Sequence, residues 1–146
     1  MRDRLDRLAQ RARSALEGDI LPFWLRLEDR DHGGHFAAMD NAGRIDRAAP
    51  KSTIFVARLL WTLSTVRRVL GSPEALAHAD RTRRFLVDRL ADPDAGGMWW
   101  SATPDGRPLE TDKHVYAQAF GIIEERLVAR RLDRMSVDGE GDGHYF

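Results

Sequence analysis

The sequence contains no cysteine and no long apolar segment, and among its basic residues it contains only two lysines. The lack of thiols excludes disulfide bonds, thiolate metal ligands and cysteine nucleophiles. No apolar run approaches the roughly 20 residues that a membrane-spanning helix requires. The first residues are too highly charged for a secretory signal. From these absences we expect a cytoplasmic protein that does not contact a membrane.

An excess of charge of either sign is also lacking. The 23 basic and 23 acidic residues cancel, and they are interspersed along the chain. Nucleic-acid binding depends on a basic face that neutralises phosphates, and the sequence provides no such face. With 42% hydrophobic and 32% charged residues in a chain of 146, the composition is that of a globular domain with a buried core.

The two lysines, Lys51 and Lys113, occupy matching positions in similar segments. Lys51 precedes the apolar segment 52–64, and Lys113 precedes a weaker copy of it at 114–120. Lysine and arginine are not interchangeable at sites that need a compact ammonium group. We interpret both lysines as anchors at helix starts, where the helix dipole disfavours a cation and a nearby carboxylate is needed. Asp112 is the natural candidate to pair with Lys113.

Helical periodicity predicts four helices. The first covers residues 3–17, is amphipathic and ends near Gly18, and the second covers 51–69 and is apolar on nearly all sides, as in a buried inner helix. The third covers 73–91, with Ser72 as N-cap and Pro73 in the first turn, and its apolar residues lie on one side. The fourth covers 113–130. Boundaries predicted in this way are accurate to a few residues.

Glycine-rich segments between these helices predict short β-hairpins near 34–40 and 97–103. Their spacing indicates an internal repeat, because Gly34 and Gly97 are 63 residues apart, as are Gly43 and Gly106, while the two lysines are 62 apart. A repeat of helix, helix and hairpin predicts a toroid of helical hairpins around a central cavity. A third hairpin seems to start at 141–146, but only 46 residues separate Gly97 from Gly143, about one helix too few.

Several of these segments together resemble the N-terminal part of the N-acylglucosamine 2-epimerase family, which includes cellobiose 2-epimerases and mannose isomerases. The resemblance covers residues 20–122. Its motifs are Phe23-Trp24-Leu25, Asp31-His32-Gly33-Gly34, Asp40-Asn41-Ala42-Gly43-Arg44, Pro50-Lys51-Ser52, Ala57-Arg58-Leu59-Leu60-Trp61-Thr62 and Asp112-Lys113-His114-Val115-Tyr116-Ala117-Gln118-Ala119-Phe120.

The resemblance implies an all-α fold: a partial, truncated (α/α)6 barrel with short β-hairpins in the Gly-Gly loops. Residues 1–146 would be one incomplete domain, and residues 123–146 depart from the family pattern. The exposed edge left by the missing repeats is expected to be sticky and to favour self-association.

The resemblance also implies a reaction and a set of substrate contacts. Family members move the C2 proton of a sugar through a cis-enediol intermediate, with two histidines as base and acid and without a metal or other cofactor. Arg58 matches the family's cavity arginine, which binds substrate oxygens near the reacting carbons, and Tyr116 and Gln118 match residues at the start of a neighbouring inner helix. The two catalytic histidines have no counterpart in this sequence, so we expect the chain alone to be inactive.

Each candidate residue also has a structural interpretation. Arg58 could form a buried ion pair with Asp112 or Glu110 instead of facing a sugar. Trp99, beside Trp100, could stack on a sugar face or pack on helix ends. His32 and His35 form only a weak zinc motif, and His114 is interpreted as structural.

Two further functions were considered. Gly33-Gly34 and Gly96-Gly97 lack the strand-then-helix context of a nucleotide loop, which excludes a nucleotide site. The alternative to a sugar epimerase is a non-catalytic helical-repeat protein that binds a partner through its unfinished edge. A histidine on an inner helix facing Arg58 would distinguish the two, and the sequence does not supply one.

Overall fold

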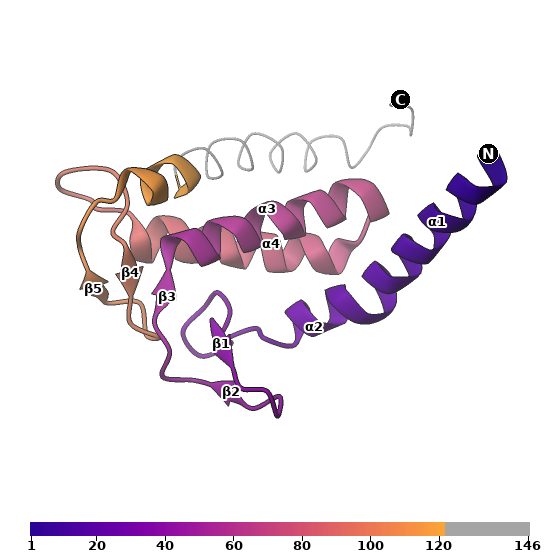
Figure 1. Cartoon of the computed structure of the whole chain (residues 1–146). Coiled ribbons are helices and arrows are strands. Elements are labelled where there is room, and N and C mark those ends of the chain that lie inside the picture. The colour runs from indigo at the N-terminus through magenta and orange to yellow at the C-terminus, as the bar shows by residue number, and fades with distance from the viewer. Residues whose placement is uncertain (122–146) are drawn as a thin grey trace.

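The computed structural model describes residues 1–121, and the helices dominate it (Figure 1). The N-terminal helical segment consists of α1 (Arg2–Ala15), a π-helical turn η1 (Leu16–Ile20) and α2 (Leu21–Leu25). The central pair is α3 (Thr53–Leu70) and α4 (Pro73–Phe85), and α4 is continued by the π-helical turn η2 (Leu86–Leu90). A last helical segment begins at 115 and is described to 121.

The N-terminal helix does not end near Gly18, so that prediction is wrong. The helical path continues through η1 into α2 and ends at Leu25. A single glycine inside a helix costs only about 1 kcal/mol relative to alanine, and Pro22 stands in the first turn of α2, where its missing N–H breaks no helical hydrogen bond. Gly18 is therefore a weak point of one long helical segment and not its end.

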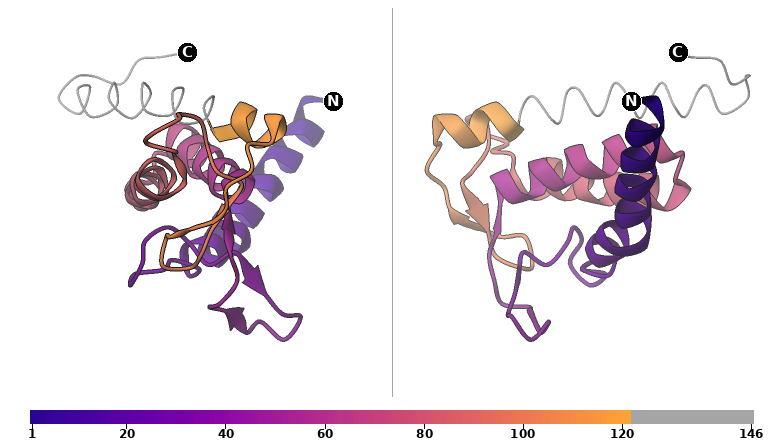
Figure 2. Two further views of the ribbon diagram at one scale, coloured as in Figure 1. Left: turned by 90° about the vertical axis from the view of Figure 1, so that its left-hand side faces the viewer. Right: turned by 45° about the vertical axis from the view of Figure 1, so that its right-hand side comes forward.

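The helices α3 and α4 form an antiparallel pair that runs side by side in all views (Figures 1 and 2). The Ser52 hydroxyl accepts a hydrogen bond from the Phe55 N–H and starts α3, while Gly71 ends it with a φ of 69°. Ser72 and Pro73 start α4 as predicted, with the Ser72 hydroxyl accepting from the Ala75 N–H. Lys51 and Ser52 form a short strand before α3 instead of its first turn.

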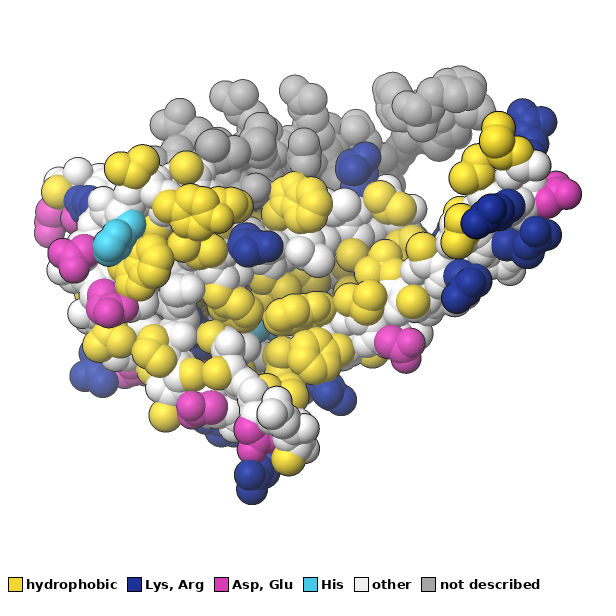
Figure 3. All heavy atoms as spheres, in the orientation of Figure 1, with side chains coloured by type: hydrophobic (Ala, Val, Ile, Leu, Met, Phe, Trp, Pro, Cys, Tyr) yellow, Lys and Arg dark blue, Asp and Glu magenta, His cyan; other side chains and the backbone are white. Residues whose placement is uncertain are grey.

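The core lies between α3, α4 and η2, and leucines dominate it. Its fully buried members include Leu60, Leu63, Leu86 and Leu90. The prediction that α3 is buried on nearly all sides is wrong, because Trp61 and Val69 on its other side are exposed. Figure 3 shows hydrophobic side chains gathered along this face of the molecule.

Five short strands form two antiparallel arrangements. The first hairpin pairs β1 (Ala38–Met39) with β2 (Ile45–Asp46). In the second, β4 (Ser101–Ala102) pairs with β5 (Pro108–Glu110) and also with β3 (Lys51–Ser52), which gives the order β3-β4-β5. Strands β1 and β4 fall inside the predicted hairpin segments 34–40 and 97–103. The expected class, helices with short hairpins in the glycine-rich loops, is confirmed in this coarse form.

The internal repeat extends to individual hydrogen bonds. The Gly33 N–H donates to the Asp29 carbonyl at 2.9 Å, and 63 residues later the Gly96 N–H donates to the Asp92 carbonyl at 3.1 Å. The hairpin turns match as well, because the Gly43 N–H donates to the Asp40 carbonyl and the Gly106 N–H to the Thr103 carbonyl. Each of these turns needs a glycine with positive φ, 80° at Gly43 and 84° at Gly106.

Three predictions concern residues outside the described part of the chain. They are the continuation of the helix 113–130 beyond 121, the start of a third hairpin at 141–146, and the departure of 123–146 from the repeat pattern.

Candidate functional site

Arg58 lies on the exposed side of α3, where two adjoining cavities meet. The first has a volume of about 440 Å³ and is lined by Trp24 of α2 together with residues of β3 and α3. The second, of about 350 Å³, lies between α3 and the segment 115–121. Arg58 and Thr62 line both cavities. The side chain of Arg58 therefore faces open, concave space and not the core.

The structure corrects the expectation that Arg58 is a buried charge in need of a partner. Its side chain is exposed, so the desolvation cost of a buried guanidinium does not arise. Within residues 1–121 it forms no ion pair with Asp112 or Glu110. The Glu110 carboxylate instead accepts a hydrogen bond from the Ser101 hydroxyl at 2.8 Å.

Tyr116 shares the second cavity with Arg58, although the two residues come from segments far apart in sequence. Its ring packs against Phe120 in an edge-on arrangement, with centroids 4.9 Å apart, and Trp61 completes this wall. The cavity thus combines a guanidinium, a threonine hydroxyl and three aromatic side chains. Such a surface provides donors for hydroxyl and carbonyl oxygens beside flat apolar faces, the two features that a sugar ring presents.

Gln118 and Trp99 are placed differently from Arg58 and Tyr116, and neither lines these two cavities. The Gln118 side chain accepts a hydrogen bond from the Met98 N–H at 2.7 Å and donates to the Met98 carbonyl at 2.5 Å. It thereby ties the start of the last helical segment to the second glycine-rich loop. The Trp99 carbonyl accepts from the Thr53 hydroxyl at 2.6 Å and joins that loop to α3.

Lys51 anchors the first glycine-rich loop from a fully buried position. Its ammonium donates to the Asp29 carboxylate at 2.7 Å and to the Gly33 carbonyl at 2.8 Å, and it lies 4.6 Å from the centre of the Phe85 ring. Burial lowers the pKa of Lys51, and the Asp29 carboxylate opposes this change. Burial would raise the pKa of Asp29, but the hydrogen bond from Lys51 outweighs it and keeps that pKa below its ordinary value.

Lys113 makes the equivalent contact in the second repeat. Its ammonium lies 2.6 Å from the carboxylate of Asp92, so Asp92 and not Asp112 is its partner, and our prediction of Asp112 is wrong. The hydrogen bond from Lys113 lowers the pKa of Asp92 to about 2. This second pair is partly open to solvent, whereas the first is enclosed.

Asp29 and Asp92 were not singled out from the sequence, although a signal was present. The two aspartates are 63 residues apart, as are the glycines that follow them, and each precedes its Gly-Gly pair by the same distance. Extending the repeat backwards from the glycines would have identified both partners.

His35 is buried and faces another histidine from α4. The His35 Nε2 atom lies 3.0 Å from His78 Nδ1, and the Thr82 hydroxyl lies 3.3 Å from His35 Nδ1. Because the Thr82 hydroxyl donates to the His78 carbonyl, it accepts from His35 Nδ1–H, which leaves His35 Nε2 to accept from His78 Nδ1–H. Burial, with the charges of His78 and Lys51, lowers the pKa of His35 to about 3, and burial also lowers the pKa of His78.

The remaining histidines do not extend this pair into a metal site. His32 Nδ1 lies 3.4 Å from the Asp29 carboxylate, away from the His35–His78 contact. Among residues 1–121, no group of three or more metal-ligating side chains is close enough to hold an ion. His114 packs on the Trp100 ring, with centroids 4.5 Å apart.

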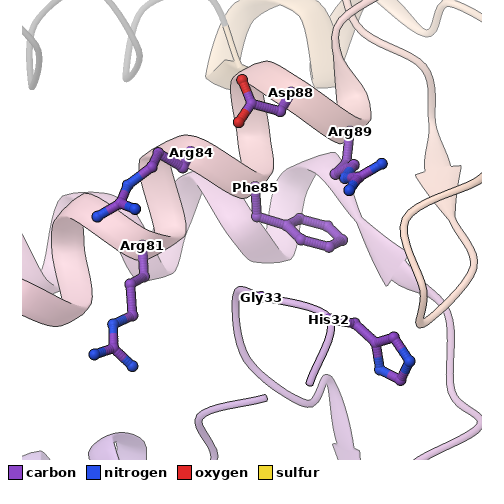
Figure 4. Close-up of a pocket in the computed structure, with 7 residues that line it drawn as sticks. All are labelled: His32, Gly33, Arg81, Arg84, Phe85, Asp88 and Arg89. Atoms are coloured by element: carbon purple, nitrogen blue, oxygen red, sulfur yellow. The ribbon is translucent and has the colours of Figure 1, made fainter. Parts of the chain in front are cut away.

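A third cavity, of about 200 Å³, lies on the opposite side of α4, over Phe85 and Gly33 (Figure 4). Three arginines line it, but their guanidinium groups point in different directions and Asp88 lies among them. Arg81 pairs with Glu28, and Arg84 pairs with Asp80. The arrangement is therefore not a converging anion site.

Comparison with known proteins identifies relatives across most of the chain. Residues 34–124 match the family model described as N-acylglucosamine 2-epimerase (GlcNAc 2-epimerase). The cellobiose 2-epimerase of Bacteroides fragilis is 37% identical over 116 residues, which is 79% of this chain and 30% of that protein. The cellobiose 2-epimerase of Eubacterium cellulosolvens is 39% identical over 103 residues, 70% of this chain and 25% of that protein.

Solved structures give the same result. The cellobiose 2-epimerase of Bacillus thermoamylovorans B4167 aligns with a TM-score of 0.79 and 30% identity over 91% of this chain and 37% of its own. The enzyme of that name from Spirochaeta thermophila DSM 6192 also aligns with a TM-score of 0.79 and 30% identity, over 99% of this chain and 40% of its own. The chain therefore spans less than half the length of the relatives it matches. Within residues 1–121, no helix has the length and apolar character to cross a membrane.

Proposed function

Because the chain belongs to the N-acylglucosamine 2-epimerase family, we propose that it provides the Arg58 side of a sugar-binding cavity in an epimerase or isomerase acting at C2. The relatives named cellobiose 2-epimerase make cellobiose the first substrate to consider, with mannose, glucose and N-acetylglucosamine as alternatives. The chain covers 30% and 25% of two of these relatives, so the activity of a complete enzyme is part of the proposal.

One observation supports the proposal most strongly: Arg58 is exposed and lines a cavity together with Tyr116. An arginine with a structural role would have both edges of its guanidinium satisfied by protein groups. Arg58 has no ion pair in the described part of the chain, and its donors are free to bind substrate oxygens. A guanidinium near C1 and C2 would favour deprotonation at C2, because it stabilises the negative charge that develops on the adjacent oxygen.

The proposed reaction needs more than this chain supplies. Moving the C2 proton requires a base within hydrogen-bond reach of it and an acid to return it. The buried His35 and His78 are bonded to each other and lie in the contact between a loop and α4, away from Arg58. We therefore propose that residues 1–146 bind sugar weakly and do not epimerise it alone.

Binding can be measured by NMR titration of the labelled chain with cellobiose, mannose and N-acetylglucosamine. We expect shifts of the Trp61 indole signal and of amides around Arg58, and we expect Arg58→Met to abolish them. Arg68→Met is the matched control, because Arg68 is an exposed arginine on α3 that lines neither cavity. The absence of shifts at saturating sugar, or equal loss in the control, would contradict the assignment of the cavity.

Catalysis is tested separately, by incubating each sugar with the chain in D₂O and following deuterium at C2. We expect no incorporation above the buffer rate, since a missing general base costs about 10²-fold or more. Incorporation would show that the chain supplies its own base, and His114, the histidine next to the cavity-lining segment, would be the first residue to replace.

A further inference from the structure

The described part of the chain consists of two equivalent units, each made of an outer helix, a glycine-rich hairpin and an inner helix. The first unit is α1 to α2, then β1 and β2, then α3. The second is α4 with η2, then β4 and β5, then the segment 115–121. The shared hydrogen bonds of the two loops establish the equivalence.

The contact between the two units has a helical part and a strand part. The inner helix α3 of the first unit packs on the outer helix α4 of the second. Beside it, β3 pairs with β4, with Lys51 opposite Ala102 and Ser52 opposite Ser101. Thr53 completes the contact, because its N–H donates to the Trp100 carbonyl at 3.0 Å and its hydroxyl to the Trp99 carbonyl.

At the end of the second unit, the surface equivalent to this contact is open. Val115 takes the place of Thr53, but its side chain is 85% exposed whereas Thr53 is fully buried. Lys113 takes the place of Lys51 and is partly exposed, since the equivalent of Phe85, on a following outer helix, is not among the described residues that surround it. We call residues 113–121 the tail surface.

At the start of the first unit, the complementary surface is open as well. The outer helix α1, equivalent in order to α4, buries no residue, and Leu5 and Leu8 are 60% and 50% exposed. Strand β1, equivalent to β4, pairs only with β2 and has no counterpart of β3 on its other edge. We call α1 together with β1 the head surface; in Figure 1 both lie away from the α3–α4 pair.

We propose that the tail surface of one copy of this chain docks on the head surface of a second copy, in the manner in which α3 and β3 dock on α4 and β4 within the chain. The occupant is a second copy because each open surface is the repeat equivalent of a surface whose partner the same chain provides. The contact is heterologous: every copy keeps one free head and one free tail, and the assembly closes into a ring or grows. The proposal does not rest on sugar binding.

The first test is the mass of the 146-residue chain, measured by light scattering and sedimentation over a concentration series from about 1 to 100 µM, the range in which weak interfaces form. We expect the mass to rise above that of the monomer. Leu8→Asp on the head and Val115→Asp on the tail each place a charge in the proposed contact and should each return the chain to the monomer. Both residues are exposed, so the fold should tolerate the changes. Ser14→Asp, on the opposite face of α1, should leave association unchanged.

Mixing the two monomeric variants gives the decisive result. The Leu8→Asp chain retains an intact tail and the Val115→Asp chain an intact head, so a head-to-tail contact predicts that the mixture forms a one-to-one dimer and nothing larger. A mixture that stays monomeric would overturn the proposal. So would a wild-type chain that is monomeric throughout the series, which would leave both surfaces to other parts of a longer protein.

Discussion

At the scale of single residues, the two lysines show how one repeated contact has different energetic weight at its two positions. Lys51 and Asp29 are both fully buried, with the Phe85 ring against the ammonium. Lys113 and Asp92 make the same contact where solvent still reaches both groups. Since a charge left unpaired in the interior cannot be hydrated, the surroundings of each pair decide what its loss costs.

We expect Lys51→Met to destabilise the chain by about 3–5 kcal/mol, because it leaves the Asp29 carboxylate buried without its partner. Lys113→Met is the matched control and should cost much less, since water can replace the ammonium at Asp92. Urea unfolding of the two variants at neutral pH measures the difference as a shift in midpoint. Equal losses would show that the enclosure of the first pair has no energetic consequence.

Arg58 is expected to show the opposite behaviour. Arg58→Met keeps the aliphatic stem and removes a charge that has no ion-pair partner in the described residues, so the free energy of unfolding should change by no more than about 0.5 kcal/mol. Urea melts of this variant beside Arg68→Met provide the comparison. A large drop in midpoint at unchanged slope would indicate an enclosed structural arginine and would defeat the sugar-site assignment.

At the scale of elements, the sequence was sufficient where the local signal was strong. Ser72-Pro73 marked the start of α4, and the glycine spacing located both hairpins. Gly18 misled because a helix tolerates one glycine when the segments on both sides remain helical. The exposure of the far side of α3 could not be predicted, because an apolar surface that lines a cavity has the same residue pattern as one that lines a core.

The site was predictable in the same uneven way. Arg58 and Tyr116 do face one cavity, which the family resemblance implied and no local pattern required. The partner of Lys113 was missed because the choice of Asp112 assumed a contact close in sequence, whereas Asp92 is brought to the lysine by the fold of the second loop. Contacts between segments far apart become predictable only when the repeat is followed through every residue, as the pairs Asp29–Lys51 and Asp92–Lys113 show.

The contact between the first loop and α4 predicts a pH dependence of stability. His35 has a pKa of about 3 in the fold, against about 6.5 in an unfolded chain. The unfolded state therefore binds a proton that the folded state excludes, and stability falls as the pH drops below about 6.5. We expect a loss of about 1.4 kcal/mol per pH unit between pH 6 and 4.5, above the range in which most carboxylates titrate.

Urea midpoints measured across this pH range test the histidine contribution. The double variant His35→Gln and His78→Gln removes both titrating groups and should flatten the dependence, whatever its stability at neutral pH. Glu74 and Arg30 act on His78 in opposite directions, and Asp29 and Lys51 act on His35 in the same way, so none of these carries the effect alone. A slope unchanged in the double variant would assign the pH dependence to other groups.

At the scale of the whole molecule, stability is distributed unevenly between the two ends and the middle. The cluster around Leu60, Leu63, Leu86 and Leu90 joins α3, α4 and η2, and Met98 links it to the second loop. Helix α1 buries no residue. Because an isolated helix shorter than about 12–15 residues is marginal in water, α1 depends on a partner surface to remain folded.

Amide hydrogen exchange should therefore separate these regions. In the monomeric Val115→Asp variant, whose head is intact but unoccupied, we expect α1 amides to exchange near the rate of an unfolded chain, while α3 amides around Leu60 and Leu63 exchange only through global unfolding. Adding the Leu8→Asp variant supplies a tail, and protection should then appear in the α1 amides of the Val115→Asp chain. Isotope labelling of that chain alone makes the measurement specific. Protection of α1 equal to that of α3 before any partner is added would contradict the assignment of α1 as an open surface.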